Sequence, residues 1–406
     1  PGVIPRERNY INPVSLRQLN WHLDMKLRAF KALIPVLTTA WVLAAVVPVQ
    51  AFDTMAEIAG SRVEYQLSSE PLNELSGNLA FVAPDGRHIT TRNAGSRKTG
   101  VIRTAHKIKG KVITSLGGRY LFALSDDGWI SKFDLAFAQL VAKIRVGQKS
   151  SNIAISAEGK WLLAGNLKPH TLVVLDTRNL RPFKIIATSD GKGKSSAVRA
   201  VYASPARQAF IVALKDLPQI WELSWDPEAA PVYGSFVHSF RVGHVEGVVV
   251  EDQPFARRRL DLKINLHDLI LDPAGAEVIG RVSGSAASVV YNLDARRKVA
   301  DLNFKDTPHF GAGRIWQIDE RVLLAVPHLD QPMVTIIDSE NWKTVRQIKT
   351  AGPGYFLPQG ISDKDLRFRI LSGPAKSTIQ MIGKRSLEIT GTNNPSAVNS
   401  LASGIP

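Results

Sequence analysis

Two consecutive stretches decide the fold: GGRYLFALSDDGWISKFDLAFAQLVAKIRVG at residues 117–147 and AEGKWLLAGNLKPHTLVVLDTRNLRPFKIIAT at residues 157–188. Each begins with a glycine turn and continues with a strand of apolar and small residues. A polar turn, a second strand ending near an aspartate, and a third strand follow. The equivalent aspartates, Asp134 and Asp176, are about 42 residues apart, which is the period of a four-stranded propeller blade.

The same pattern recurs along most of the chain. It is clear at 274–304 and 319–350 and weaker at 78–104, 206–225 and 364–389. A sheet with two apolar faces buries them by stacking on its neighbours around a ring. The sequence therefore predicts an all-β chain folded as a β-propeller of about seven to eight four-stranded blades. Three alternatives for its closure stay open: a seven-bladed ring, a ring closed by the N-terminal strand, and a chain truncated at the C-terminal blade. Residues 236–262 exceed a usual linker and are predicted to be an inserted loop.

Residues 1–51 are predicted to lie outside the folded domain. From Met25 the chain reads MKLRAFK, a cationic start, then the apolar run ALIPVLTTAWVLAAVV, and a small-x-small site ending at Ala51. This order is typical of a secretory signal. We expect an upstream segment that is not native at 1–24, a signal peptide at 25–51, the propeller at 52–390 and a flexible tail at 391–406. Localisation is then periplasmic, with no stable membrane anchor after cleavage; an uncleaved anchor is the alternative.

The composition of the chain excludes several kinds of metal and cofactor site. The 406 residues include no cysteine, which excludes disulfides, Cys-ligated zinc, iron–sulfur clusters and covalent attachment of haem c. The formal net charge is +15, and +11 remains without residues 1–51, which hold six Lys/Arg and two acidic residues. Because the basic residues are scattered rather than gathered in a stripe, no nucleic-acid partner is predicted. A solvated basic surface and a site for a polycarboxylate ligand both remain open.

Three histidines occur at strand edges, where a β-rich fold presents loop residues to a ligand. They are His267 in LHD at 266–268, His309 in TPHFGAG at 307–313 and His328 in PHLD at 327–330. These motifs resemble the haem d1 propeller domain of cytochrome cd1 nitrite reductase and its stand-alone relatives in haem d1 biosynthesis. The organisation is most like that of the stand-alone relatives, because no haem c attachment is present.

The resemblance implies a tetrapyrrole site. It places His267 and His309 on the distal side of haem d1 or a late precursor, as catalytic and cofactor-binding residues. Imidazole can ligate iron and can transfer a proton near neutral pH. Further cofactor-binding candidates are His106, Arg119, Lys215, Arg314 and His328; Arg241 and Arg281 could also meet carboxylates.

The iron ligand is left open. The family's proximal histidine position is occupied here by Gly110, and His106 lies four residues away. Ala312 stands where nitrite reductases have an arginine after the histidine. Three alternatives stay open: ligation by one distal histidine, of which His309 is the candidate, ligation by His106, and ligation by neither. Trp316 is predicted to pack within a blade rather than against a macrocycle.

The function that these patterns favour is a periplasmic propeller that assists haem d1 biosynthesis or delivery. As an oxidoreductase it would convert a propionate side chain to an acrylate, resembling a dihydro-haem d1 dehydrogenase. Expected partners are other haem d1 biosynthesis proteins or a cytochrome electron partner. The alternative is a propeller without haem that binds a protein or another ligand; it would require a flat surface with exposed aromatic residues.

Overall fold

The structure is a computed structural model that describes residues 79–82, 85–92, 99–237, 247–251, 253–285, 287–304, 306–357 and 364–393. The described residues all belong to the larger of two units of chain, Arg62–Pro406. The predicted upstream segment, the signal peptide and all but the first three residues of the predicted tail lie outside the described residues. No helix in the described part of the chain is long and apolar enough to cross a membrane.

The described strands form seven blade-like sheets, six with four strands and one with three, and a separate two-stranded hairpin. The first sheet contains β1 (Leu79–Val82), β2 (His88–Arg92) and β3 (Thr99–Arg103). The second contains β4 (Ile108–Thr114), β5 (Tyr120–Ser125), β6 (Trp129–Asp134) and β7 (Gln139–Arg145). The third contains β8 (Lys149–Ile155), β9 (Trp161–Lys168), β10 (Thr171–Asp176) and β11 (Pro182–Ala187). The fourth contains β12 (Val198–Ser204), β13 (Ala209–Leu214), β14 (Gln219–Ser224) and β17 (Arg257–Asp261).

The remaining three sheets follow the same plan. The fifth contains β18 (Leu266–Leu271), β19 (Glu277–Val282), β20 (Ser288–Asn292) and β21 (Arg297–Leu302). The sixth contains β22 (Arg314–Ile318), β23 (Arg321–Pro327), β24 (Met333–Asp338) and β25 (Thr344–Lys349). The seventh contains β26 (Gly354–Phe356), β27 (Asp365–Ile370), β28 (Ile379–Gly383) and β29 (Ile389–Asn393). Two short 3₁₀ turns, η1 (Pro205–Arg207) and η2 (Phe310–Ala312), lie between strands.

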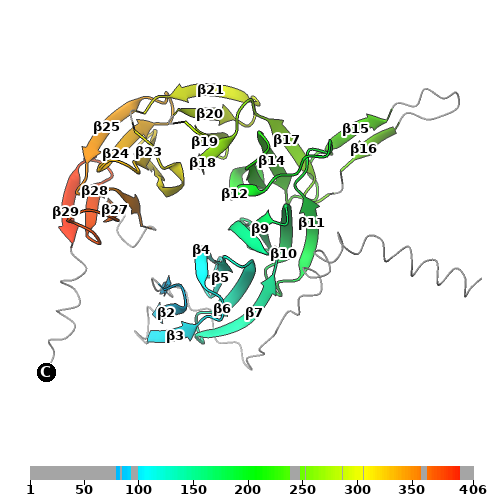
Figure 1. Cartoon of the computed structure of the whole chain (residues 1–406), viewed down its shortest axis with the longest axis horizontal. Coiled ribbons are helices and arrows are strands. Elements are labelled where there is room, and N and C mark those ends of the chain that lie inside the picture. The colour runs from blue at the N-terminus through cyan, green and yellow to red at the C-terminus, as the bar shows by residue number, and fades with distance from the viewer. Residues whose placement is uncertain are drawn as a thin grey trace, which may run out of the picture. The chain divides into compact units, whose positions relative to one another are not determined.

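Each four-stranded sheet is antiparallel, and the sheets follow one another along a curved row (Figure 1). The first strand of a sheet is its inner strand, and β8 contacts both β4 and β12 there. In such a sheet the connection from the preceding sheet and the turn between the second and third strands lie at the same end. This end is called the connection end below. It gathers loop residues from several sheets around the inner strands.

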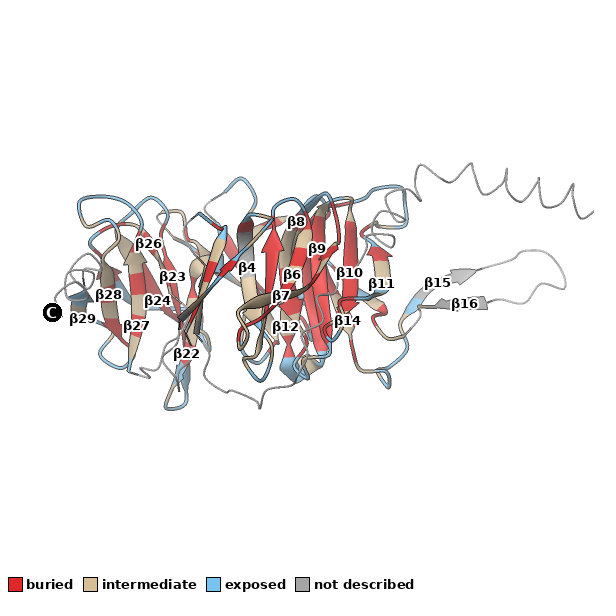
Figure 2. Cartoon of the chain, turned by 90° about the horizontal axis from the view of Figure 1, so that it is seen from below, coloured by how far each residue is buried: buried red, intermediate tan, exposed pale blue. Residues whose placement is uncertain are grey.

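The core lies between neighbouring sheets. One cluster of buried side chains joins the third sheet to the fourth, with Leu163 and Val174 packed against Phe210 and Trp221. Figure 2 shows buried residues along the inner and middle strands and exposed residues in the loops. Because burial of one large aliphatic side chain is worth about 1.5–3 kcal/mol, stacking supplies the main stabilisation. Trp316 is buried in such a cluster, as predicted.

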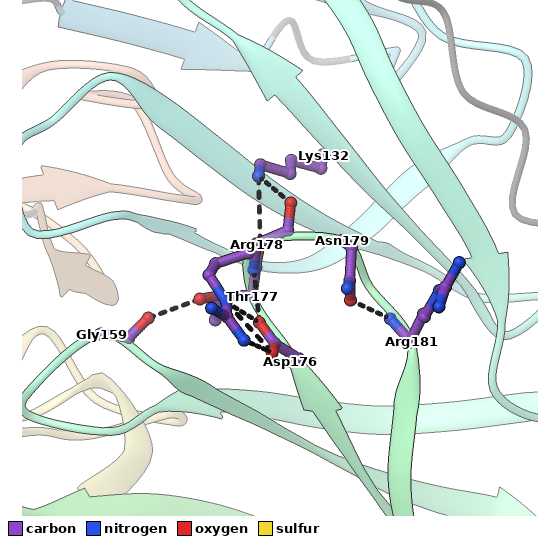
Figure 3. Close-up of polar contacts among 7 residues, drawn as sticks. All are labelled: Lys132, Gly159, Asp176, Thr177, Arg178, Asn179 and Arg181. Atoms are coloured by element: carbon purple, nitrogen blue, oxygen red, sulfur yellow. Dashed lines mark hydrogen bonds and ion pairs between the residues drawn. The ribbon is translucent and has the colours of Figure 1, made fainter.

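A buried polar link also joins the second and third sheets. Lys132 on β6 is 4% exposed, and its ammonium donates to the carbonyls of Thr177 at 3.0 Å and Arg178 at 2.9 Å (Figure 3). Its Nζ also lies 4.0 Å from the centroid of the Tyr120 ring. The two carbonyls and the aromatic face replace water around the charge.

The inserted segment is shorter than predicted. Its strands β15 (Tyr233–Val237) and β16 (Gly247–Val250) form the hairpin that leaves the fourth sheet, as Figure 1 shows. The expectation that the insertion reaches residue 262 is wrong, because β17 pairs with β14 as the fourth strand of the blade. Leu260 of β17 is buried, while Arg257 and Arg259 lie over the ring of Trp221 at 5.7 and 5.5 Å. The strand could not be recognised from its arginine-rich sequence, because the arginine side chains cover an aromatic ring and leave no pattern of alternating apolar residues.

Candidate functional site

A cavity of about 870 Å³ lies where the inner strands of several sheets begin, at the connection end. Its wall is formed by β4, β8, β12 and β18, by β19, and by the segment from η2 into β22. This volume falls in the range of roughly 300–1,000 Å³ that is common for small-molecule sites. The lining residues are Val112, Asn152, Arg199, Ala200, Tyr202, His267, Asp268, Leu269, Ile270, Arg281, His309, Gly311, Gly313, Arg314 and Leu329.

His267 reaches the cavity from an irregularity in β18. The strand register with β19 shifts between Leu266 and Asp268, so that His267 is the extra residue of a β-bulge. Arg281 donates from Nη2 to Nδ1 of His267 at 3.0 Å. A neutral ring whose Nδ1 accepts a hydrogen bond carries its proton on Nε2. His267 is therefore held as a donor toward its remaining neighbours.

The surroundings of His267 favour its neutral form. Its pKa lies below the ordinary value, firstly because partial burial disfavours the charged ring and secondly because the positive charges of Arg199 and Arg281 oppose protonation. Lys215 adds to the same effect, whereas Asp268 opposes it. His267 is thus a neutral imidazole beside a cluster of cations.

His309 enters the cavity from the connection between the fifth and sixth sheets. It precedes the turn η2, and its backbone N–H donates to the carbonyl of Pro327 at 2.8 Å. Its side chain is 38% exposed, and Nε2 lies 3.9 Å from Oδ1 of Asp268. Both predicted distal histidines consequently face the same cavity, from neighbouring sheets.

Three arginines give the cavity its positive character. Burial lowers the pKa of Arg199 and of Arg314, yet a guanidinium stays charged near neutral pH. The Nε atoms of Arg199 and Arg281 are buried and have no hydrogen-bond partner among the described residues. Buried donors of this kind are normally satisfied, so they suit an anionic ligand group. Arg314 partly satisfies its donors with the carbonyls of Gly313 and Phe356, at 3.3 and 3.4 Å.

The other predicted site residues lie elsewhere. Lys215 is exposed at a second-to-third-strand turn of the connection end, outside the cavity lining. His106 lies at the same end but bonds Asp127 through Nδ1 at 2.8 Å and stacks on Trp129, 4.6 Å between centroids. The structure does not bring either residue into the cavity wall.

His328 and Arg119 also lie outside the cavity lining, and each has a partner within its own sheet. His328 is 1% exposed and shares a 2.8 Å hydrogen bond with Thr335 through Nε2, so it belongs to the core of the sixth sheet. Arg119 lies at the opposite end of its sheet, in the turn between β4 and β5, and pairs with Asp134 at 2.9 Å. Arg241 lies outside the described residues.

Sequence reasoning missed Arg199, Tyr202 and Asp268. Tyr202 lines the cavity while its hydroxyl donates to the carbonyl of Leu269 at 2.5 Å, and burial raises its pKa. Asp268 is part of the LHD motif, so an acid next to a candidate histidine was a usable signal. Arg199 had no comparable signal, because its direction depends on where β12 lies in the ring.

The residues present fit a tetrapyrrole with acidic side chains. The cavity offers arginine donors for carboxylates and two imidazoles for iron or proton transfer. No cluster of three or more His, Cys, Asp or Glu that could bind a bare metal ion occurs within the described residues.

Fold and site together define a β-propeller with a basic, histidine-containing cavity at one end of its inner strands. Residues 82–402 match the family model described as Cytochrome D1 heme domain, and the chain belongs to this family. The resemblance seen in the histidine motifs is thereby confirmed.

Relatives narrow the comparison. The chain is 31% identical over 321 residues to the dihydro-heme d1 dehydrogenase of Pseudomonas aeruginosa, covering 79% of this chain and 60% of that protein. It thus spans well under two thirds of that relative's length. It is 23% identical over 347 residues to Protein NirF of the same organism, covering 81% of each. The solved structure of dihydro-heme d1 dehydrogenase NirN in complex with DHE matches with a TM-score of 0.70 at 28% identity, over 83% of this chain and 69% of that chain. The predicted propeller fold is confirmed.

Proposed function

We propose that this protein binds haem d1 or a late haem d1 precursor in the cavity and serves haem d1 biosynthesis or delivery. The observation that carries the proposal is the convergence of His267 and His309 with Arg199, Arg281 and Arg314 on one cavity. The relatives named for dihydro-haem d1 support the choice of ligand.

Each residue has a role that follows from its surroundings. Arg199 and Arg281 bind carboxylates, because their buried Nε donors have no protein partner among the described residues. His267 donates a hydrogen bond from Nε2, because Arg281 occupies its Nδ1. His309 is the partly exposed imidazole and provides the iron ligand or the proton acceptor. His106 does not line the cavity and is the weaker candidate for ligation.

The same cavity suits oxidation of a propionate side chain to an acrylate. That reaction removes two protons and two electrons from adjacent carbons, converting CH₂–CH₂ to CH=CH. A bound tetrapyrrole iron would supply the redox chemistry. His309 would accept one of the two protons and water the other, and an external one-electron acceptor such as a cytochrome would take the two electrons in two steps. Partner proteins are then a cytochrome or other proteins of haem d1 biosynthesis.

The site of action is the periplasm. This part of the proposal is supported by the signal-like sequence at 25–51, which lies outside the described residues.

An absorption titration tests the binding proposal. The purified protein is titrated with haem d1 and, as a control, with protohaem, which lacks the d1 substituents. We expect saturable spectral shifts that are specific to haem d1 and that weaken at least about tenfold in His309→Ala, equivalent to 1.4 kcal/mol. Arg297→Ala, on an exposed part of β21, is the matched surface control. Folded wild-type protein that shows no shift would refute the proposal.

A further inference from the structure

Asp268 joins the two histidine-bearing segments of the cavity. It follows His267 on β18, and its Oδ1 accepts a hydrogen bond from the backbone N–H of Gly311 at 2.9 Å. Gly311 belongs to η2, the turn that begins directly after His309. A strand of the fifth sheet is thereby tied to the turn that leads into the sixth. The carboxylate side chain is 13% exposed, whereas Gly311 lies at the surface.

The second carboxylate oxygen is not used by the protein. Oδ2 of Asp268 is buried and has no hydrogen-bond partner among the described residues. An unsatisfied buried acceptor costs about 1–3 kcal/mol, more when it is charged. Asp268 lines the cavity, so a donor in the cavity can offset this cost.

The imidazole of His309 also lies close to this carboxylate. Its Nε2 lies 3.9 Å from Oδ1 of Asp268, which is an ion-pair distance and too long for a hydrogen bond. An approach of about 1 Å would bring the two groups to the length of a charge-assisted hydrogen bond.

The contact with Asp268 requires a glycine at position 311. A Cβ atom added there would lie 2.8 Å from Oδ1 of Asp268, closer than real Cβ contacts allow. A larger residue at 311 would push the carboxylate away from the amide that it accepts. The glycine and the aspartate therefore form one unit.

We propose that Asp268 is a positioning residue that fixes the His309 turn through the Gly311 amide and orients the His309 imidazole, whose Nε2 lies 3.9 Å from its carboxylate. The second half rests on the proposed function, because it concerns the His309 ring in the loaded cavity. Asp268 acts through His309 and does not itself ligate iron.

The first test needs no ligand. Amide hydrogen exchange at Gly311 is measured in the wild-type protein and in Asp268→Asn, Asp268→Ala and the control Asp301→Asn, which changes an exposed carboxylate of β21. We expect at least tenfold faster exchange in Asp268→Ala. Asp268→Asn keeps an oxygen for the amide and should stay close to wild type. Equal exchange in Asp268→Ala and wild type would overturn the positioning role.

A double-mutant cycle in the same ligand-free protein tests whether Gly311 and Asp268 are energetically coupled. Gly311→Ala should lower the urea midpoint in the wild-type background and lower it much less in Asp268→Ala, where the clashing oxygen is gone. Equal losses in both backgrounds would show that Gly311 and Asp268 are independent, against the proposal.

The second test separates the charge from the scaffold. Haem d1 affinity is measured by absorption in the wild type, Asp268→Asn and Asp301→Asn. We expect Asp268→Asn to weaken binding at least tenfold, although its Gly311 amide remains protected, whereas Asp301→Asn should bind like wild type. Affinity identical to wild type in Asp268→Asn would reduce Asp268 to a structural residue and overturn its role toward His309. If the wild type itself binds no haem d1, the proposed function and the role toward His309 both fail. The exchange experiment still shows whether Asp268 fixes the turn through the Gly311 amide.

Discussion

Arg281 donates to Nδ1 of His267 at 3.0 Å across the bulge that separates β18 from regular pairing with β19. The contact is formed between a cation and a ring that would repel it if protonated. It therefore links the shape of the cavity to the protonation of one of its histidines.

Removal of this cation should raise the pKa of His267. In Arg281→Met the ring loses a nearby positive charge and a donor that fixes its neutral form, while its burial and the charge of Arg199 remain. The expected pKa thus moves toward the ordinary value without passing it. A pH titration of the histidine ring signals by NMR measures the change, with Arg297→Met as the surface control. An unchanged or lower pKa in Arg281→Met would contradict the assignment.

Acid should destabilise the protein through His328. Burial lowers its pKa, so below the unfolded-state value of about 6.5 the unfolded chain binds more protons than the folded one. The contribution is fully favourable above that value and is lost as the pH falls through it. We expect the free energy of unfolding in urea to drop less between pH 7.5 and pH 5.5 in His328→Gln than in wild type. His170→Gln, whose ring contacts only the hydroxyl of Ser195 among the described contacts, is the control. Equal drops in wild type and His328→Gln would refute this prediction.

Lys132, which links the second and third sheets, should make the free energy of unfolding depend on pH above about pH 8. Burial lowers the pKa of Lys132 to about 8, below its ordinary value. Between that pKa and about 10.5 the unfolded chain binds more protons, so stability rises with pH in this window. Lys132→Met should lose this rise. At pH 7.5 it should also be less stable by about 1–3 kcal/mol, because the carbonyls of Thr177 and Arg178 lose their donor.

The measurement is urea unfolding at pH 7.5 and pH 9.5. Lys192→Met removes an exposed lysine from the turn after Asp190 and controls for net charge. A Lys132→Met protein as stable as this control would show that the buried link contributes nothing.

The fold could be predicted because its signals are local and repeated. The glycine turn, the apolar strand and the aspartate recur in phase, so spacing predicted a propeller of about seven to eight blades, and the described strands form seven sheets besides the hairpin. β17 was not predicted as a strand because its arginines cover Trp221. A strand that packs through the aliphatic stems of charged side chains shows no alternation of apolar residues in its sequence.

The site could be predicted only in part. His267 and His309 were found from their motifs, and both line the cavity. His328 has a similar motif but lies in the core, because its ring bonds Thr335 on the neighbouring strand. Sequence spacing places such a residue at a sheet end but does not say whether it faces the ring interior or the neighbouring blade. Arg199 was missed for the same reason.

Because neighbouring blades are closely stacked, we expect substitution of Gly165 on β9 to lower the stability of the protein. A Cβ atom there would lie 2.5 Å from Cγ1 of Val198 and 2.9 Å from Cγ2 of Val201, both on β12 of the next sheet. Because protein cores cannot absorb an added methyl at such distances, Gly165→Ala should cost about 1–3 kcal/mol in free energy of unfolding.

Gly117→Ala is the matched control, since an added Cβ there meets nothing within 4 Å. The double variant Gly165→Ala with Val198→Ala should recover part of the loss, because removing the valine methyls makes room for the new one. Urea unfolding of the four proteins measures both effects. If Gly165→Ala cost no more than Gly117→Ala, the third and fourth sheets would not be packed as closely as these distances require, and the inner strands that shape the cavity would have more freedom than the site assignments assume.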